Sequence, residues 1–144
     1  MLALLASLAI AVAAPGTPPA AHGSASPAAV ARAWSTALNA NRNVEAAKLF
    51  ALNARVVQPG VDAKLTSRAL AIAFNASLPC AGRVIAVTVT GNRAVATFVL
   101  GERPKHHCDA PGVKAAALFV VRNGKIVLWQ QVAVPKPDEN APIA

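Results

Sequence analysis

Two segments in the C-terminal half of the chain alternate apolar and polar residues on either side of a two-residue turn signal. One covers residues 83–100 around Gly91-Asn92, and the other covers residues 114–134 around Asn123-Gly124. A period of two is typical of half-buried strands, and a Gly/Asn pair between two such runs predicts a tight hairpin. We therefore expect two hairpins, and thus four antiparallel strands, which excludes an all-helical fold.

Counting outwards from each turn predicts which side chains share a face of the sheet. At the first hairpin Ile85 faces Phe98, and the residues on that face are all apolar. At the second hairpin Phe119 faces Leu128, while the opposite face carries Leu118, Val120, Val127 and Trp129. The second hairpin is therefore expected to be apolar on both faces.

An antiparallel sheet packed on helices usually leaves one face polar, so the second apolar face needs a cover. Exposed apolar patches of this kind are typical of interaction surfaces. We predict a homodimer with Trp129 near the centre of its interface, where buried tryptophans often concentrate binding energy. The other predicted interface residues are Leu118, Val120 and Val127. The C-terminal tail or the N-terminal linker is the alternative cover.

The residues before the hairpins predict three helices and a short strand. Ser26-Pro27 is a helix start, with Ser as the cap and Pro at the first helical position. Helical spacing then predicts a second helix from about Val44 to Asn53, a strand at 56–58, and a third helix that begins after Thr66 or Ser67. This order favours an α+β fold: a strongly bent antiparallel sheet packed on three N-terminal helices.

Residues 1–14 are apolar throughout, and residues 11–13 read Ala-Val-Ala, a signal-peptide cleavage pattern. The stretch is shorter than the roughly 20 residues of a spanning helix. No Lys or Arg precedes Arg32, which is unusual for a signal peptide, and an uncleaved membrane anchor is the alternative. We expect a signal peptide at 1–14, a flexible linker at 15–26, one domain at 27–135 and a tail at 136–144, in a protein that is secreted or held in the periplasm or cell envelope.

The chain has two cysteines, Cys80 and Cys108. In an oxidising compartment an isolated pair predicts one disulfide. The run from His106 to Asp109 contains potential metal ligands, but adjacent residues rarely point at one ion and no second pair has zinc-like spacing. We therefore expect neither a metal site nor another cofactor.

The formal net charge is +8. The basic residues are scattered over predicted helices, turns and strand ends, and no aromatic residues alternate with them to stack on bases. This pattern weighs against a nucleic-acid partner. A solvated basic surface, with weak attraction to anionic polymers or lipid head groups of the envelope, is the expectation.

The order of the elements and four pieces of sequence resemble the nuclear transport factor 2-like superfamily, and within it the SnoaL-like proteins. The pieces are VARAWSTALNA (30–40), ARVVQPG (54–60), TSRALAIAF (66–74) and FVVRNGKIVLWQQV (119–132). The resemblance covers about residues 26–135. It implies a cone-shaped sheet whose concave face, closed by helices, leaves an apolar pocket. The family includes enzymes and binding proteins, so the fold alone does not supply a function.

The catalytic residues of the family are poorly matched in this chain. Its ketosteroid isomerases carry a carboxylate base on the strand before a Pro-Gly-like turn, where this chain has Gln58, and an amide cannot accept a proton at useful pH. Those enzymes also use a tyrosine hydroxyl, and the chain has no tyrosine. Family epoxide hydrolases use an Asp–Arg–Asp arrangement, but Asp62 and Asp109 lie in turn-rich segments and Asp138 in the tail.

The sequence therefore favours an exported, non-catalytic domain that binds a small apolar or amphipathic ligand in the cone. Predicted lining residues are Trp34, Phe50, Phe74, Phe98 and Phe119, with polar contacts from Gln58 and Gln130. Plain core packing is the alternative for each aromatic residue. Two other functions stay open: a SnoaL-like enzyme of the isomerase, cyclase or epoxide-hydrolase type, and a dimeric interaction module without a ligand.

Overall fold

The computed structural model describes residue 16 and residues 24–137. The predicted signal peptide, most of the linker and most of the tail lie outside the described residues. The elements are α1 (Pro27–Asn39), α2 (Asn43–Lys48), β1 (Phe50–Gln58), β2 (Val61–Leu65), α3 (Arg68–Ser77), β3 (Ala81–Thr90), β4 (Arg93–Gly101), β5 (Lys114–Arg122) and β6 (Lys125–Val132). No helix within the described ranges is long and apolar enough to cross a membrane.

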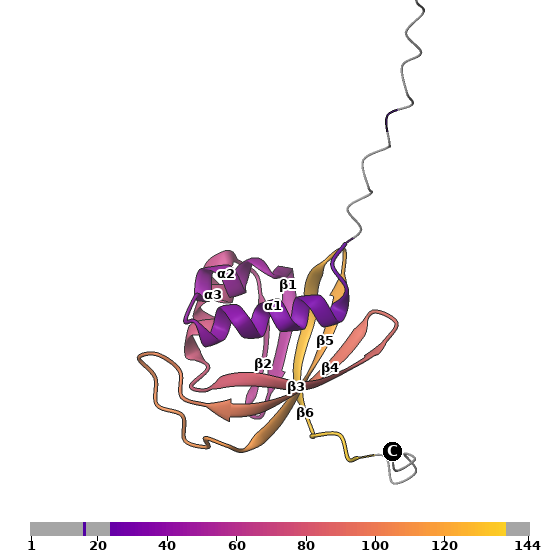
Figure 1. Cartoon of the computed structure of the whole chain (residues 1–144). Helices are drawn as coiled ribbons and strands as arrows, with labels where there is room; N and C mark the ends of the chain where they lie inside the picture. Colours follow the sequence, from indigo (N-terminus) through magenta and orange to yellow (C-terminus); the bar gives the residue numbers. More distant parts are fainter. Residues whose placement is uncertain (1–15, 17–23, 138–144) are drawn as a thin grey trace, which may run out of the picture.

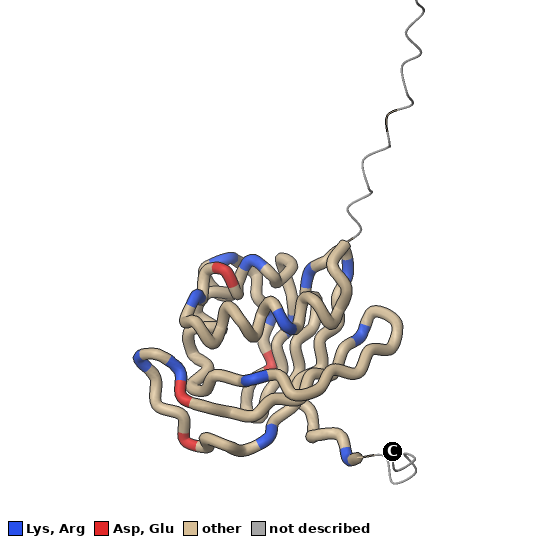
Figure 2. The backbone as a smooth tube through the Cα atoms, in the orientation of Figure 1, with Lys and Arg blue, Asp and Glu red and all other residues tan. Residues whose placement is uncertain are grey.

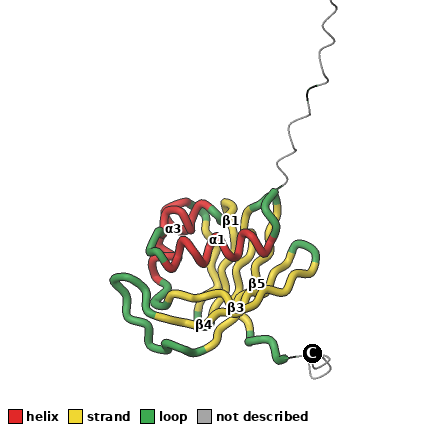
Figure 3. The backbone as a smooth tube through the Cα atoms, in the orientation of Figure 1, coloured by secondary structure: helices red, strands yellow, loops and turns green. Residues whose placement is uncertain are grey.

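The six strands form one open sheet in the order β2-β1-β6-β5-β4-β3. The three helices lie on one side of it, and α1 runs across the strands (Figure 1; Figure 3). The predicted α+β class with three helices and two C-terminal hairpins is confirmed. One detail differs: β1 and β6 are parallel, so the sheet is mixed rather than wholly antiparallel. We call the side packed on the helices the inner face and the other side the outer face.

The pairing of the strands changes register at three places. One extra residue lies at Ile85 in β3 and one at Val127 in β6, while β1 has three extra residues between Phe50 and Arg55. Phe98 consequently pairs with Val84, and the expected pairing of Ile85 with Phe98 is wrong. A bulge adds one unpaired residue to a strand, bends it and increases its twist. These irregularities therefore fit a sheet that curves around α1.

The helix starts follow the predicted capping signals. The Ser26 hydroxyl accepts a hydrogen bond from the Ala29 amide (3.1 Å), and the Ser67 hydroxyl accepts one from the Leu70 amide (3.2 Å). The second helix is shorter than predicted, because α2 ends at Lys48 and the chain enters β1 at Phe50. Helical spacing of the apolar residues there is overridden by pairing with β6, which is a tertiary contact that local spacing cannot report.

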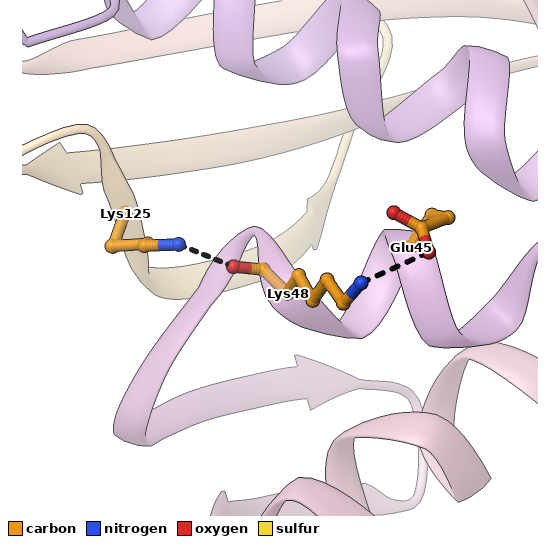
Figure 4. A network of polar contacts seen from close by, with 3 residues as sticks. All are labelled: Glu45, Lys48 and Lys125. Carbon is orange, nitrogen blue, oxygen red and sulfur yellow. Dashed lines mark hydrogen bonds and ion pairs between the residues drawn. The ribbon is translucent and has the colours of Figure 1, made fainter.

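A small network ties the end of α2 to the tip of the β5–β6 hairpin (Figure 4). The Lys125 ammonium donates to the backbone carbonyl of Lys48 at 2.6 Å, and the Lys48 ammonium donates to Glu45 at 3.1 Å. A cation on the last carbonyls of a helix both satisfies a free acceptor and matches the helix dipole. The network fixes the hairpin tip against the helical layer.

Trp34 stands at the centre of the core. It lies on α1, is 4% exposed, and its ring centroid is 6.1 Å from that of Phe98, 5.4 Å from Phe119 and 5.8 Å from Trp129. Its indole Nε1 donates to the buried side-chain oxygen of Asn75 on α3 at 2.8 Å. One aromatic side chain thus joins α1, α3 and three strands.

The predicted disulfide between Cys80 and Cys108 is present, with the Cα atoms 4.7 Å apart. It fastens the loop after β4 to the start of β3. Arg103 strengthens the same junction, because its guanidinium donates to the carbonyls of Asn75 (2.8 Å) and Leu78 at the end of α3. Both links hold the loop, β3 and α3 in one unit.

Candidate ligand-binding pocket

A pocket of about 290 Å³ lies between α1 and the inner face of the sheet. Its volume is near the lower end of the range for small-molecule sites. The wall combines one side of α1, the segment between α3 and β3, the start of β3, and parts of β1, β4, β5 and β6. The lining residues are Trp34, Leu38, Gln58, Leu78, Pro79, Cys80, Gly82, Phe98, Leu100, Ala115, Ala116, Ala117, Trp129 and Gln131.

The space exists because small residues stand where large ones would fill it. Three consecutive alanines of β5, residues 115–117, form part of the wall. Gly82 also lines it, and a Cβ atom at that position would lie only 3.0 Å from Cδ1 of Phe98. The Ser35 hydroxyl (2.6 Å) and the Asn39 amide (3.0 Å) both donate to the Gly82 carbonyl, which fixes α1 against this edge of the pocket.

The predicted aromatic residues divide between the pocket and the core. Trp34 and Phe98 line the pocket, as expected from the sequence. Phe50, Phe74 and Phe119 do not; they are packed in the core, and Phe119 is fully buried. These three thus occupy core positions, which were the alternative for each, and they lie outside the wall of this pocket.

The polar residues of the pocket are Gln58 and Gln131, not Gln58 and Gln130. Gln130 pairs with Leu118, whose side chain is on the outer face, and Gln131 pairs with Ala117, which lines the pocket. The cause is the bulge at Val127: a slip of one residue moves every later side chain to the opposite face. The prediction of Gln130 as a pocket contact is therefore wrong by one position.

The same slip overturns the predicted position of Trp129. Trp129 pairs with Phe119 rather than lying opposite Leu118, and it is 5% exposed. Its ring is 5.2 Å from that of Phe74, inside the core. The outer face keeps Leu118 and Val120, now opposite Gln130 and Leu128, and Val127 is the bulge residue itself. Association of two copies through this face stays a prediction, but Trp129 cannot stand at its centre.

Several of the residues that line the pocket were not predicted from the sequence. Leu38, Leu100 and the alanines of β5 carry no chemical signature. Trp129 was placed on the wrong face, and Gln131 takes the position that was expected of Gln130. Cys80 was predicted only as a disulfide partner and not as a pocket residue. A disulfide between the start of a strand and a returning loop also predicts that both segments border the same end of the sheet.

None of the lining residues can carry a charge. Asp62 is instead at the exposed edge of the sheet, where Arg55 donates to it at 2.6 Å and 2.8 Å, and this hydrogen bonding lowers the pKa of Asp62. Asp109 is exposed in the disulfide loop, 3.4 Å from His107. Among the described residues no three His, Cys, Asp or Glu side chains gather as a potential metal site.

The surface charges are spread widely. Lys and Arg occur on the helices, at hairpin tips and along the loop after β4, without forming one continuous band in the view of Figure 2. Arg103 is the exception in burial: it is 2% exposed, and desolvation lowers its pKa. Its partners are carbonyl oxygens rather than carboxylates, so it acts as a structural cation at the base of the disulfide loop.

Solved structures with the same arrangement of elements identify the fold. An NTF2-like protein of unknown function from Cytophaga hutchinsonii has a TM-score of 0.61 and 14% identity over 74% of this chain and 88% of that one. A protein with a ketosteroid isomerase-like fold from Catenulispora acidiphila, solved in complex with trimethylamine, has a TM-score of 0.61 and 19% identity over 76% and 87%. The chain has the nuclear transport factor 2-like fold.

A proposed polyketide cyclase from Sinorhizobium meliloti shares this nuclear transport factor 2-like fold, with a TM-score of 0.58 and 18% identity over 72% of this chain and 93% of that one. No protein-family model matches the sequence, and no curated protein does. The neighbours thus include proteins of unknown function and of cyclase type, and identities below 20% show the fold and not the activity.

Proposed function

We propose that this protein is an exported binding domain that holds a small apolar or amphipathic molecule in the pocket beneath α1. The observation that carries the proposal is an unfilled volume of about 290 Å³ whose wall is almost entirely apolar and includes two tryptophans and a phenylalanine. Concave apolar sites with a few convergent polar groups are the usual form of small-molecule sites.

The residues available at the pocket support binding rather than catalysis. General acid–base chemistry needs a group that exchanges a proton near neutral pH, and the wall offers amides, aliphatic groups, aromatic rings and a disulfide. Gln58 lies on the inner face at the end of β1, in the position where the resemblance to isomerases would put a carboxylate. A SnoaL-like enzyme is the second candidate, favoured by the cyclase-type neighbour.

Export is supported by the apolar residues 1–14 and by the disulfide, because oxidising compartments favour such bonds. The proposal expects the mature protein to be recovered outside the cytoplasm with its N-terminus shortly after residue 13. Fractionation of the native host and N-terminal sequencing test this part. Recovery of the full-length chain in the cytoplasm would contradict it.

Tryptophan emission tests binding directly, because both tryptophans line the pocket and the chain has no tyrosine. Titration with the uncharged probe N-phenyl-1-naphthylamine is expected to change this emission saturably. Ala117→Phe, or the half-buried Ala115→Phe if the first variant does not fold, fills the pocket and abolishes the response. The matched control Thr88→Phe adds the same ring on the outer face and leaves binding unchanged. Equal binding by all these variants would contradict the proposal.

A further inference from the structure

Two glutamines occupy neighbouring positions on paired strands of the pocket wall. β1 and β6 are parallel neighbours, and Val57 is paired with Gln130 on the outer face. The next residue of each strand, Gln58 and Gln131, turns to the inner face, and both line the pocket. Gln131 is exposed and Gln58 is half-buried, so the pair lies at the more open end of the site.

Both amides are free to bind a ligand. Neither side chain takes part in the side-chain hydrogen bonds found among the described residues. A primary amide offers two N–H donors and one carbonyl acceptor. Two adjacent amides can therefore donate to and accept from the same head group at once.

Trp129, whose ring lines the same pocket, carries a buried polar group. The indole Nε1 of Trp129 is buried and has no hydrogen-bond partner among the described residues, whereas that of Trp34 is paired with Asn75. An unpaired buried donor lowers stability, because it has lost its hydrogen bond to water without gaining another. The signal of this N–H group should therefore respond when a ligand packs against the Trp129 ring.

The pocket offers no countercharge to a charged head group, since none of its lining residues is ionisable. Even at this more open end, a charged head gives up part of its hydration to bind, and two neutral amides without an opposite charge replace that hydration incompletely. The wall next to the amides is formed by Trp129, Ala117 and other apolar residues, which suit a hydrocarbon body.

We propose that the pocket selects uncharged amphiphiles, with the apolar body between Trp34, Phe98 and Leu38 and a neutral donor–acceptor head at Gln58 and Gln131. Hydroxyl and primary amide groups are the heads that fit. This inference rests on the proposed binding function and adds the chemical class of the ligand.

Four ligands with the same eight-carbon chain test the head group: octanol, octanamide, octanoate and octylammonium. Binding is followed by tryptophan emission at pH 7. The two neutral ligands are expected to bind at least tenfold more tightly than either ion. Octanoate or octylammonium binding as tightly as octanol would overturn the inference while leaving the proposed binding function intact. No response to any of the four ligands, nor to N-phenyl-1-naphthylamine, would overturn the binding function itself.

A matched pair of variants tests the amides. Gln131→Leu and Gln58→Leu are each expected to weaken octanamide binding by about three- to tenfold, as loss of one or two hydrogen bonds implies. Gln130→Leu makes the same change one residue away on the outer face and should leave affinity unchanged. Equal effects of Gln131→Leu and Gln130→Leu, or no effect of either pocket variant in a folded protein, would refute the role of the amide pair.

Discussion

The hydrogen bond between Trp34 and Asn75 permits a prediction whose size follows from burial. Asn75 is fully buried and its side-chain oxygen accepts from the Trp34 indole at 2.8 Å. Asn75→Leu has a side chain of similar volume, so its main effect is to leave the indole donor unpaired in the core. The free energy of unfolding should fall by about 1–3 kcal/mol.

A double-mutant cycle separates this bond from the packing of the ring. Trp34→Phe alone leaves the Asn75 oxygen unpaired and also removes buried ring surface. The double variant lacks both donor and acceptor, and replacing both partners by apolar groups is much less costly than removing one. We expect the double variant to be more stable than the sum of the single effects predicts, by about 1–3 kcal/mol.

Urea denaturation followed by far-ultraviolet circular dichroism measures the free energy of unfolding of the unmutated protein, the two single variants and the double variant. This signal is suitable because it does not depend on the tryptophan that is changed. Asn39→Leu with Trp34→Phe provides a control cycle, since Asn39 bonds to Gly82 and not to the indole. Additivity of Trp34→Phe and Asn75→Leu to within about 0.5 kcal/mol would refute the reasoning.

Three further predictions concern the disulfide, Trp129 and the Arg55–Asp62 pair. The double variant Cys80→Ala with Cys108→Ala should lower the free energy of unfolding by about 3–4 kcal/mol in the chain-entropy model. A reductant should lower the urea midpoint of the unmutated protein and leave that of the double variant unchanged. An equal effect of the reductant on both proteins would contradict this prediction. Trp129→Lys should abolish the cooperative thermal transition, because it puts an unpaired charge into the core, whereas recovery of a folded soluble monomer would argue for an outer-face position. Arg55 lowers the pKa of Asp62 in the folded state, so the contribution of the pair to the free energy of unfolding is fully present above the ordinary pKa of 3.8 and is lost as pH falls through the lower folded pKa. The difference in stability between the unmutated protein and Asp62→Asn should therefore shrink in that pH range. A difference that does not change with pH would refute the pairing.

Local signals were enough to predict most of the elements of this fold. The caps at Ser26 and Ser67, the turn glycines and the two hairpins all act within a few residues, so the sequence reports them directly. Gly91 and Gly124 both have the positive φ that the predicted tight turns require, 59° and 73°. The end of α2 at Lys48 was missed because pairing between β1 and β6 decides it.

The face of each strand was harder to predict than its existence. Counting outwards from the Asn123-Gly124 turn assigns the correct face to Val121 and Ile126. Beyond them the bulge at Val127 reverses the inner and outer positions along β6. That reversal moved Trp129 into the core and exchanged Gln130 for Gln131 at the pocket. Where a bulge lies in a stretch of apolar residues, the sequence pattern does not predict which residues face inwards, because either register buries hydrophobic side chains.

The two indole N–H groups allow the most direct measurement of the central claim, that the pocket binds a small neutral molecule. In a ¹⁵N-edited NMR titration with octanol, the folded protein gives one indole cross-peak from each tryptophan, and Trp34→Phe assigns them. The account predicts a saturable shift of the Trp129 signal, which has no internal partner, and a smaller shift of the Trp34 signal, which stays bonded to Asn75. Saturation with both indole signals unmoved, or shifts confined to outer-face residues such as Leu118 and Gln130, would contradict it.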